Sequence, residues 1–225
     1  REYRTLVYQR SKGARDTRAF GSVFEANRVG AEWLNHSLDP EPIHNEDPRV
    51  IFGEKHCKQP YAASPLNISA MSYGSLSKPA IQALSHGAQM SGCWLNTGEG
   101  GLSPFHLEGG CDIVFQLGTA KFGARNDDAT LNTDKLAKIC ENPQIKMIEI
   151  KLSQGAKPGK GGILPAEKVT AEIAEIRGIK EGEAAISPNR HVDAGNPEEL
   201  LDLIHKTREA SGRPVGIKFV VGNFV

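Results

Sequence analysis

The stretch MIEIKLSQGAKPGKGGILP, at residues 147–165, decides the fold class of this chain. An apolar run passes into a loop rich in glycine and lysine, and no acidic residue follows Lys151 within it. Such a transition is typical of parallel βα units, in which ligands bind beyond the carboxyl ends of the strands. Similar transitions end in SYG at 72–74 and in TGEGG at 97–101. The pattern therefore predicts an α/β protein whose ligand site is built from these loops.

Hydrophobic periodicity divides the chain into two parts. Residues 1–60 are polar and turn-rich, so we expect an irregular N-terminal lead-in with a short helix at 23–34. Residues 61–225 alternate between strand and helix patterns. The expected elements are main strands at 66–71, 93–96, 146–152 and 215–220, a further apolar run at 113–117, and helices at 78–91, 133–140, 165–177 and 196–211. About four βα units fit half of a (β/α)8 barrel, or a doubly wound sheet.

The composition, 39% hydrophobic and 24% charged with a formal net charge of zero, is that of an ordinary globular protein. Zero net charge implies no broad attraction to nucleic acid or to a membrane surface. No apolar run approaches the roughly 18 residues of a membrane span, and no signal peptide is visible. Because the chain begins at Arg1 and not at Met, we expect it to be cut from something longer. A membrane anchor upstream of Arg1 therefore stays an open alternative.

The cysteines are widely spaced and contain no CxxC pair, which argues against a zinc site or an iron–sulfur cluster here, and we expect no metal. They are Cys57, Cys93, Cys111 and Cys140. Reduced, mostly buried thiols are expected, which fits a cytoplasmic protein.

The glycine-lysine loop is not a phosphate loop of the Walker type. After Gly155, Lys160 stands where that motif requires its second glycine, and no GxGxxG follows a strand elsewhere. Backbone amides together with Lys157, Lys160 and Gln154 suit a carboxylate or another small anion. A solvated surface turn explains the same residues, so both interpretations stay open.

Other candidate residues lie at the predicted strand ends. Glu99 stands among glycines, where it could orient an amine or relay a proton, or lie in a turn with an exposed acid. Lys151 and Lys218 each end an apolar run, and a lysine in a buried strand is costly unless it is paired, so both suggest function. Tyr73 could line a flat cofactor or lie half-buried in a tight turn. His191, in SPNRHVD, is interpreted as a solvated loop histidine.

Several blocks together resemble the FMN-dependent synthase domain of glutamate synthases. These are SAMSYGS, NTGEGG, EIKLSQGAKPGKGG, LP-x2-KVT-x2-IA-x2-R, SP-x2-H and the lysine of the final strand. The blocks VYQRSKG, EWLNHSL and HCKQPY of the lead-in are similar to the shorter, related branch that lacks the large amidotransferase domain. The resemblance implies an FMN-binding (β/α)8 TIM barrel, here truncated after about four βα units, with residues 61–225 as its N-terminal half.

The implied reaction is the reductive amination of 2-oxoglutarate with ammonia, in which reduced FMN passes a hydride to 2-iminoglutarate to give L-glutamate. The resemblance makes Glu99 and Lys157 catalytic and places Gln154, Lys157, Arg177 and Glu99 on the substrate. It places Ser72 and Tyr73 beside the flavin, and Gln116, Lys151 and Lys218 at its ring. An amidotransferase or an electron donor is an expected partner, and a lysine near the ring stabilises the negative charge of reduced flavin.

Departures from the family pattern keep other readings open. Ile163 replaces a glutamine, Asn189 and Arg190 replace prolines, and Val192 replaces a second histidine. Because the chain ends after about four units, the flavin phosphate loops and the cysteines of any iron–sulfur cluster would lie in the missing half. One rival is an N-methylglutamate-forming enzyme that uses methylamine. The other is a catalytically incompetent half-barrel that needs a partner or self-associates through its exposed edges.

Overall fold

The computed structural model describes residues 2–15, 25, 27–33, 35–42, 48–157 and 159–220. The chain forms two compact units, Arg1–Glu46 and Asp47–Val225. The first unit contains helix α1 (Glu2–Ser11), which the sequence pattern did not predict. The helix expected at 23–34 is wrong where it is described, because residues 27–33 form turns and loop. Gly30 has a φ of 81°, which ends any helical run there. The rest of that helix lies outside the described residues.

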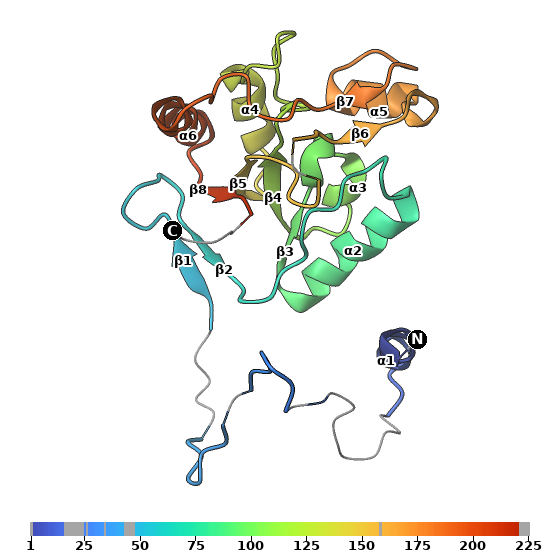
Figure 1. Cartoon of the computed structure of the whole chain (residues 1–225), viewed down its shortest axis with the longest axis vertical. Helices are drawn as coiled ribbons and strands as arrows, with labels where there is room; N and C mark the ends of the chain where they lie inside the picture. The colour runs from blue at the N-terminus through green and yellow to red at the C-terminus, as the bar shows by residue number, and fades with distance from the viewer. Residues whose placement is uncertain are drawn as a thin grey trace. The chain divides into compact units, whose positions relative to one another are not determined.

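A parallel sheet forms the centre of the second unit (Figure 1). Its order is β3 (Trp94–Asn96), β4 (Asp112–Leu117), β5 (Ile145–Lys151) and β8 (Val215–Lys218), and all neighbours are parallel. The strand expected at 66–71 is reduced to one bridge, in which Ile68 pairs with Leu95. The α/β class is therefore confirmed. The described strands form an open sheet, so closure into a barrel stays a prediction.

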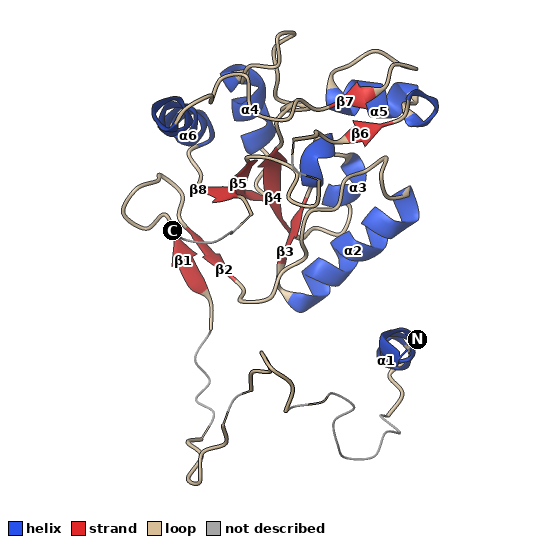
Figure 2. Cartoon of the chain, in the orientation of Figure 1, coloured by secondary structure: helices blue, strands red, loops and turns tan. Residues whose placement is uncertain are grey.

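Helices cover one face of this sheet (Figure 2): α2 (Lys78–Ser91), α4 (Thr133–Cys140) and α6 (Pro197–Ser211). Their apolar sides and apolar strand residues form the main core, in which seven strand side chains are fully buried. These are Leu95, Ile113, Phe115, Leu117, Ile145, Ile148 and Ile150. Each such side chain contributes about 1.5–3 kcal/mol of burial free energy, so this face fixes the register of the sheet.

The helices begin and end where the sequence signals predicted. Asn196 caps α6 by accepting the N–H of Glu199 at 2.8 Å, and Pro197 occupies the first helical position. Gly92 ends α2 in the left-handed conformation. The helix expected at 165–177 is divided into η2 (Ala166–Lys168) and α5 (Ala171–Arg177). The division follows because Thr170 is extended and caps α5, which no helix interior permits.

Two antiparallel strand pairs were not expected. The first pairs β1 (Val50–Phe52) with β2 (Tyr61–Ala63), and the second pairs β6 (Ile163–Leu164) with β7 (Ala185–Ile186). The β6–β7 pair packs with α5 around a small core of its own that includes Phe122, beyond the carboxyl ends of the sheet strands. Between β3 and β4 the chain forms η1 (Gly98–Gly100) and α3 (Pro104–Leu107). These additions enclose the loops that carry the candidate site.

Candidate active site

The sheet face opposite the helices carries polar side chains. Along β5, Met147, Glu149 and Lys151 alternate with the buried Ile148 and Ile150, and so lie on this open face. Neighbouring strands add Asn96, Gln116 and Lys218, which bond to Glu149 or to one another. The alternation therefore gives one strand an apolar side for the core and a polar side for chemistry.

Lys218 has the partner that a half-buried lysine needs. Its Nζ lies 2.7 Å from Oε1 of Glu149, and it also donates to Oε1 of Gln116. Asn96 donates to the same Glu149 oxygen at 2.9 Å. The Nε2 of Gln116 is buried and has no hydrogen-bond partner among the described residues. This face therefore presents a cation and one unused N–H donor side by side.

Three loop and strand side chains meet above this row. Gln154 donates to Oε2 of Glu99 at 2.5 Å, and Nζ of Lys151 donates to Oε1 of Gln154 at 2.8 Å. Nζ of Lys151 also lies 3.4 Å from the Glu99 carboxylate. The side chains of Glu99 and Lys151 are only 20% and 18% exposed, so the interpretation of Glu99 as an exposed turn acid is wrong. The three residues form a closed network that we call the Glu99 cluster.

Glycines make room for this cluster. A Cβ at Gly162 would lie 2.0 Å from Oε1 of Glu99, and a Cβ at Gly118 would lie 2.8 Å from Cβ of Glu99. Both values are shorter than real Cβ contacts. Glycine at these positions therefore allows the backbone of two other loops to approach Glu99 closely.

Arg177 lies next to the Glu99 cluster and is 4% exposed. Its Nη2 donates to the main-chain oxygen of Tyr73 at 3.3 Å, and its guanidinium lies 5.1 Å from the ring centre of Phe122. Burial lowers the pKa of Arg177, and the charge of Glu99 opposes that shift. Its Nε is buried without a partner among the described residues. Arg177 and Glu99 both line one small cavity, together with Ser75, Gly162, Ile163, Leu164, Ala185 and Ser187.

Ser72 and Tyr73 border the η1 loop. A Cβ at Gly100 would lie 3.3 Å both from Cβ of Ser72 and from the main-chain oxygen of Tyr73. The Tyr73 hydroxyl donates to Oε2 of Glu172 at 2.5 Å, and its ring meets Phe105 edge-on at 4.9 Å. Burial and then the Glu172 contact raise the pKa of Tyr73 to about 12. The side chain of Tyr73 therefore binds α5 and not the Glu99 cluster.

Lys157 is not brought into the cluster. It lies on an exposed turn, where its main-chain N–H donates to the carbonyl of Gln154 at 3.3 Å. Its ammonium makes no hydrogen bond or ion pair with the described residues, and Lys160 is also exposed. The glycine-lysine loop thus contributes Gln154 and Gly162 to the site, whereas its lysines lie outside.

Comparison with known sequences decides the family. A sequence model of the family described as "Conserved region in glutamate synthase" matches residues 25–225. The chain belongs to this glutamate synthase family. The resemblance that the sequence motifs carry is therefore confirmed at the level of the family.

Relatives in the glutamate synthase family support the assignment. The chain is 44% identical over 187 residues to "Glutamate synthase large subunit-like protein YerD" of Bacillus subtilis (strain 168), a match covering 82% of this chain and 35% of the relative. It is 41% identical over 176 residues to "Archaeal-type glutamate synthase [NADPH]" of Thermotoga sp. (strain RQ2), covering 77% and 32%. It is 40% identical over 157 residues to "Archaeal glutamate synthase [NADPH]" of Methanocaldococcus jannaschii, covering 69% and 28%. The chain spans about a third of the length of these relatives.

Two members of this candidate site were missed or misread from the sequence. Glu149 was not singled out, although its place two residues before Lys151 in a strand puts both on one face. His191 was expected to be solvated, but it is 2% exposed, and its Nε2 donates to the main-chain oxygen of Lys151 at 2.8 Å. Burial lowers its pKa. No local pattern distinguishes it, because distant loops bury it.

The described residues contain no group of three or more His, Cys, Asp or Glu side chains that could hold a metal ion. Within the same residues, no helix combines the length and the apolar character needed to cross a bilayer. The four cysteines are free, and Cys93, Cys111 and Cys140 are buried.

Proposed function

We propose that the full-length protein is an FMN-dependent glutamate synthase that aminates 2-oxoglutarate with ammonia to give L-glutamate. The observation that carries the proposal is the convergence of Gln154 and Lys151 on the Glu99 carboxylate, beside the buried guanidinium of Arg177. The guanidinium of Arg177 suits a keto-acid carboxylate, since its planar donors match carboxylate geometry. Family membership and the relatives named as NADPH-dependent glutamate synthases support the same reaction class, and NADPH as the source of electrons.

The open sheet face fits a flat heteroaromatic cofactor. The unused Nε2 donor of Gln116 can donate to a ring acceptor, and Lys218 beside it supplies a positive charge. When bound, FMN supplies the hydride, which no side chain of this chain can provide. Lys218 would stabilise negative charge at that position, while Glu149 keeps the lysine in place when the charge is absent.

Within the Glu99 cluster, each residue has a role that follows from its contacts. Gln154 and Lys151 donate to Glu99 and hold the carboxylate at the edge of the cavity. The carboxylate would accept an N–H of ammonia and orient its lone pair toward the keto carbon. Arg177 would hold a carboxylate of the keto acid. The buried walls exclude water, which strengthens both interactions.

The test is glutamate formation by purified full-length protein, loaded with FMN and supplied with 2-oxoglutarate, ammonium and a chemical reductant. Glu99→Gln keeps the size of the side chain but removes the charge, and we expect a fall in kcat of about 10²-fold or more. Glu183→Gln is the matched control, because Glu183 is exposed in an ion pair with Lys180. The proposal would be refuted if Glu99→Gln kept the activity of the wild type, as the control should, or if the wild type formed no glutamate.

A second candidate uses methylamine in place of ammonia and forms N-methylglutamate. It is favoured by Ile163, which lines the same cavity and is 61% exposed. Ile163 pairs across the two strands with Ile186, which is 62% exposed. An aliphatic rim can contact a methyl group, which ammonia lacks. The ratio of kcat/KM for the two amines decides between the candidates. A preference for methylamine that Ile163→Gln reverses would establish this alternative, and a preference for ammonia in both proteins would exclude it.

Exposed apolar side chains on β1 and on the edge strand β8 favour association with further structure. Val50, Ile51 and Phe52 of β1 are each at least 43% exposed, and Ile217 of the edge strand β8 is 43% exposed. Such apolar surface favours covering by further strands of a longer chain or by a partner. Sedimentation of this chain alone and of the full-length protein tests this proposal. If the short chain associates and the full-length protein does not, the result supports covering of this surface within the longer chain.

A further inference from the structure

A buried ion pair joins the loop that follows β4 to the loop between β7 and α6. The side chain of Lys121 is fully buried, and its Nζ lies 2.5 Å from Oδ1 of Asp193. The same ammonium lies 3.3 Å from the main-chain oxygen of Ala129, and Oδ2 of Asp193 accepts the N–H of Leu131 at 3.0 Å. A buried charge is costly unless it is paired and hydrogen-bonded. The pair therefore favours only those conformations in which the two loops are together.

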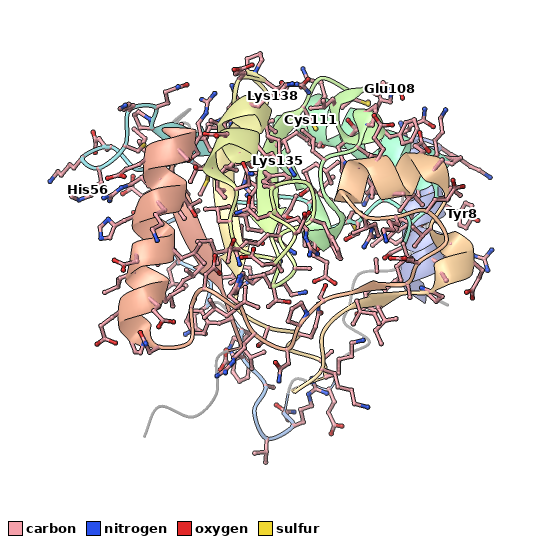
Figure 3. The ribbon with its side chains drawn as sticks, turned by 90° about the horizontal axis from the view of Figure 1, so that it is seen from above. Tyr8, His56, Glu108, Cys111, Lys135 and Lys138 are labelled. Atoms are coloured by element: carbon pink, nitrogen blue, oxygen red, sulfur yellow. The ribbon has the colours of Figure 1, made fainter. Side chains whose placement is uncertain are left out.

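The backbone at Lys121 is itself held in an unfavourable conformation. Its φ is 49°, in the left-handed region, which costs a non-glycine residue about 1 kcal/mol or more. Burial lowers the pKa of Lys121, and the hydrogen bond and charge of Asp193 oppose that shift. The loop is also anchored to α4, because Lys135, labelled in Figure 3, donates to the main-chain oxygen of Arg125 at 3.0 Å. The Lys121 end of the pair is thus fixed on the sheet side.

The Asp193 end belongs to a segment, 187–193, that is tied to the site at its start. The N–H of Ser187 donates to the main-chain oxygen of Gly162 at 2.9 Å. The hydroxyl of Thr119 donates to the main-chain oxygen of Pro188 at 2.6 Å. These bonds connect the segment to β6 and to the loop after β4.

The middle of the segment reaches the Glu99 cluster through His191. Its Nε2 donates to the main-chain oxygen of Lys151, whose own side chain donates to Gln154. At the other contact, the backbone of Gly162 lies directly against the Glu99 carboxylate. The segment therefore holds the backbone of Lys151 and of Gly162, the two residues that it contacts beside the Glu99 carboxylate.

We propose that Lys121 and Asp193 are positioning residues, which fix the 187–193 segment and thereby keep Glu99 and Gln154 in place. Neither side chain lines the cavity. They act through the two backbone contacts described above, at the ends of two strands. The effect on catalysis rests on the proposed function, whereas the positioning itself is a property of the chain that can be measured without turnover.

Hydrogen exchange measured by mass spectrometry on the full-length protein tests the positioning. Asp193→Asn leaves the lysine charge unpaired, and we expect at least tenfold faster exchange in peptides covering 187–195 and 151–157, with α2 unchanged. Lys180→Met is the control, because Lys180 and Glu183 form an exposed pair at 3.8 Å, and it should leave every peptide unchanged. Faster exchange throughout, including α2, or unchanged exchange at 151–157 would overturn the proposal.

A second variant guards against misfolding of the first. The double variant Lys121→Met with Asp193→Leu removes both charges and keeps the buried volume, so we expect the fold to persist. It also removes the hydrogen bonds to Ala129 and Leu131, so we expect amide hydrogen exchange in 187–195 to become about tenfold faster. Wild-type protection of 187–195 in this variant would mean that the pair only fills space, and would overturn the proposal.

The kinetic arm separates this inference from the proposed function. In both variants we expect KM for ammonium, which Glu99 would orient, to rise about tenfold, with an unchanged flavin absorbance spectrum. A loosened segment with an unchanged KM would overturn the link to the site. If the wild type forms no glutamate, the proposed function fails, and the exchange measurements still decide the positioning.

Discussion

Two adjacent glycines allow the site and the fold to be perturbed separately. A Cβ at Gly162 would lie 2.0 Å from Oε1 of Glu99 and 3.2 Å from Nε2 of Gln154, both at the ends of flexible side chains. A Cβ at Gly161 would lie 1.6 Å from the main-chain oxygen of Ser187. The side chains can move aside, whereas the backbone cannot. Gly162→Ala should therefore damage the site, and Gly161→Ala should damage the fold.

The size of the displacement sets the expected loss. Ordinary contact begins at 3.4 Å, so Oε1 of Glu99 must move by about 1.4 Å in Gly162→Ala. A shift of that size turns the carboxylate, whose other oxygen, Oε2, accepts the hydrogen bond from Gln154, and for a catalytic group it costs about 10²-fold in rate. Gly161→Ala should instead cost about 1–3 kcal/mol of unfolding free energy, as overpacking does. That lowers Tm by several degrees in a protein of this size.

The assay compares kcat/KM for glutamate formation with Tm from circular dichroism for both variants. We expect Gly162→Ala to lose about 10²-fold in kcat/KM with Tm within about 2 °C of the wild type. Full activity in Gly162→Ala would refute the placement of Glu99 in the reaction. A larger fall in Tm for Gly162→Ala than for Gly161→Ala would refute the packing argument.

Two further predictions concern buried ionisable groups. Burial lowers the pKa of His106 and of His191 below the usual 6.5, so the unfolded chain takes up protons first as the pH falls. Unfolding free energy should therefore decline below about pH 6.5, by up to roughly 1.4 kcal/mol per pH unit for each histidine; a flat urea-unfolding profile between pH 7.5 and 5.5 would contradict this. Burial raises the pKa of Cys140 to about 11, so iodoacetamide at pH 8 should label the partly exposed Cys57 and leave Cys140 unmodified until urea is added. Equal native labelling of both thiols would show that Cys140 is accessible.

Much of the second unit could be predicted because its signals are local. The bounds of α2 and α4 agree with the expected helices at 78–91 and 133–140, since the apolar periodicity lies within each helix and the capping residues lie directly beside it. The strands β3, β4, β5 and β8 lie within two residues of the expected runs.

The remaining features depend on contacts between distant residues. The strands β6 and β7 have two residues each and lie about 20 residues apart in the sequence, which is too short for any alternation of apolar and polar residues to be detected. His191 is buried by loops that the sequence does not place beside it. Lys157 was grouped with Gln154 on the glycine-lysine loop and through the family resemblance, yet Lys157 lies on an exposed turn. Proximity along a loop does not determine which side chains share a site.

The alternation along β5 has a consequence for protein engineering. Positions 148 and 150 serve only the core, whereas 147, 149 and 151 serve only the open face. A combinatorial library limited to the second set, together with 116 and 218 on the adjoining strands, would vary the chemical environment of a bound ligand while sampling few unfolded sequences. Insertion of a single residue within this strand would exchange the two sets and abolish folding and chemistry together.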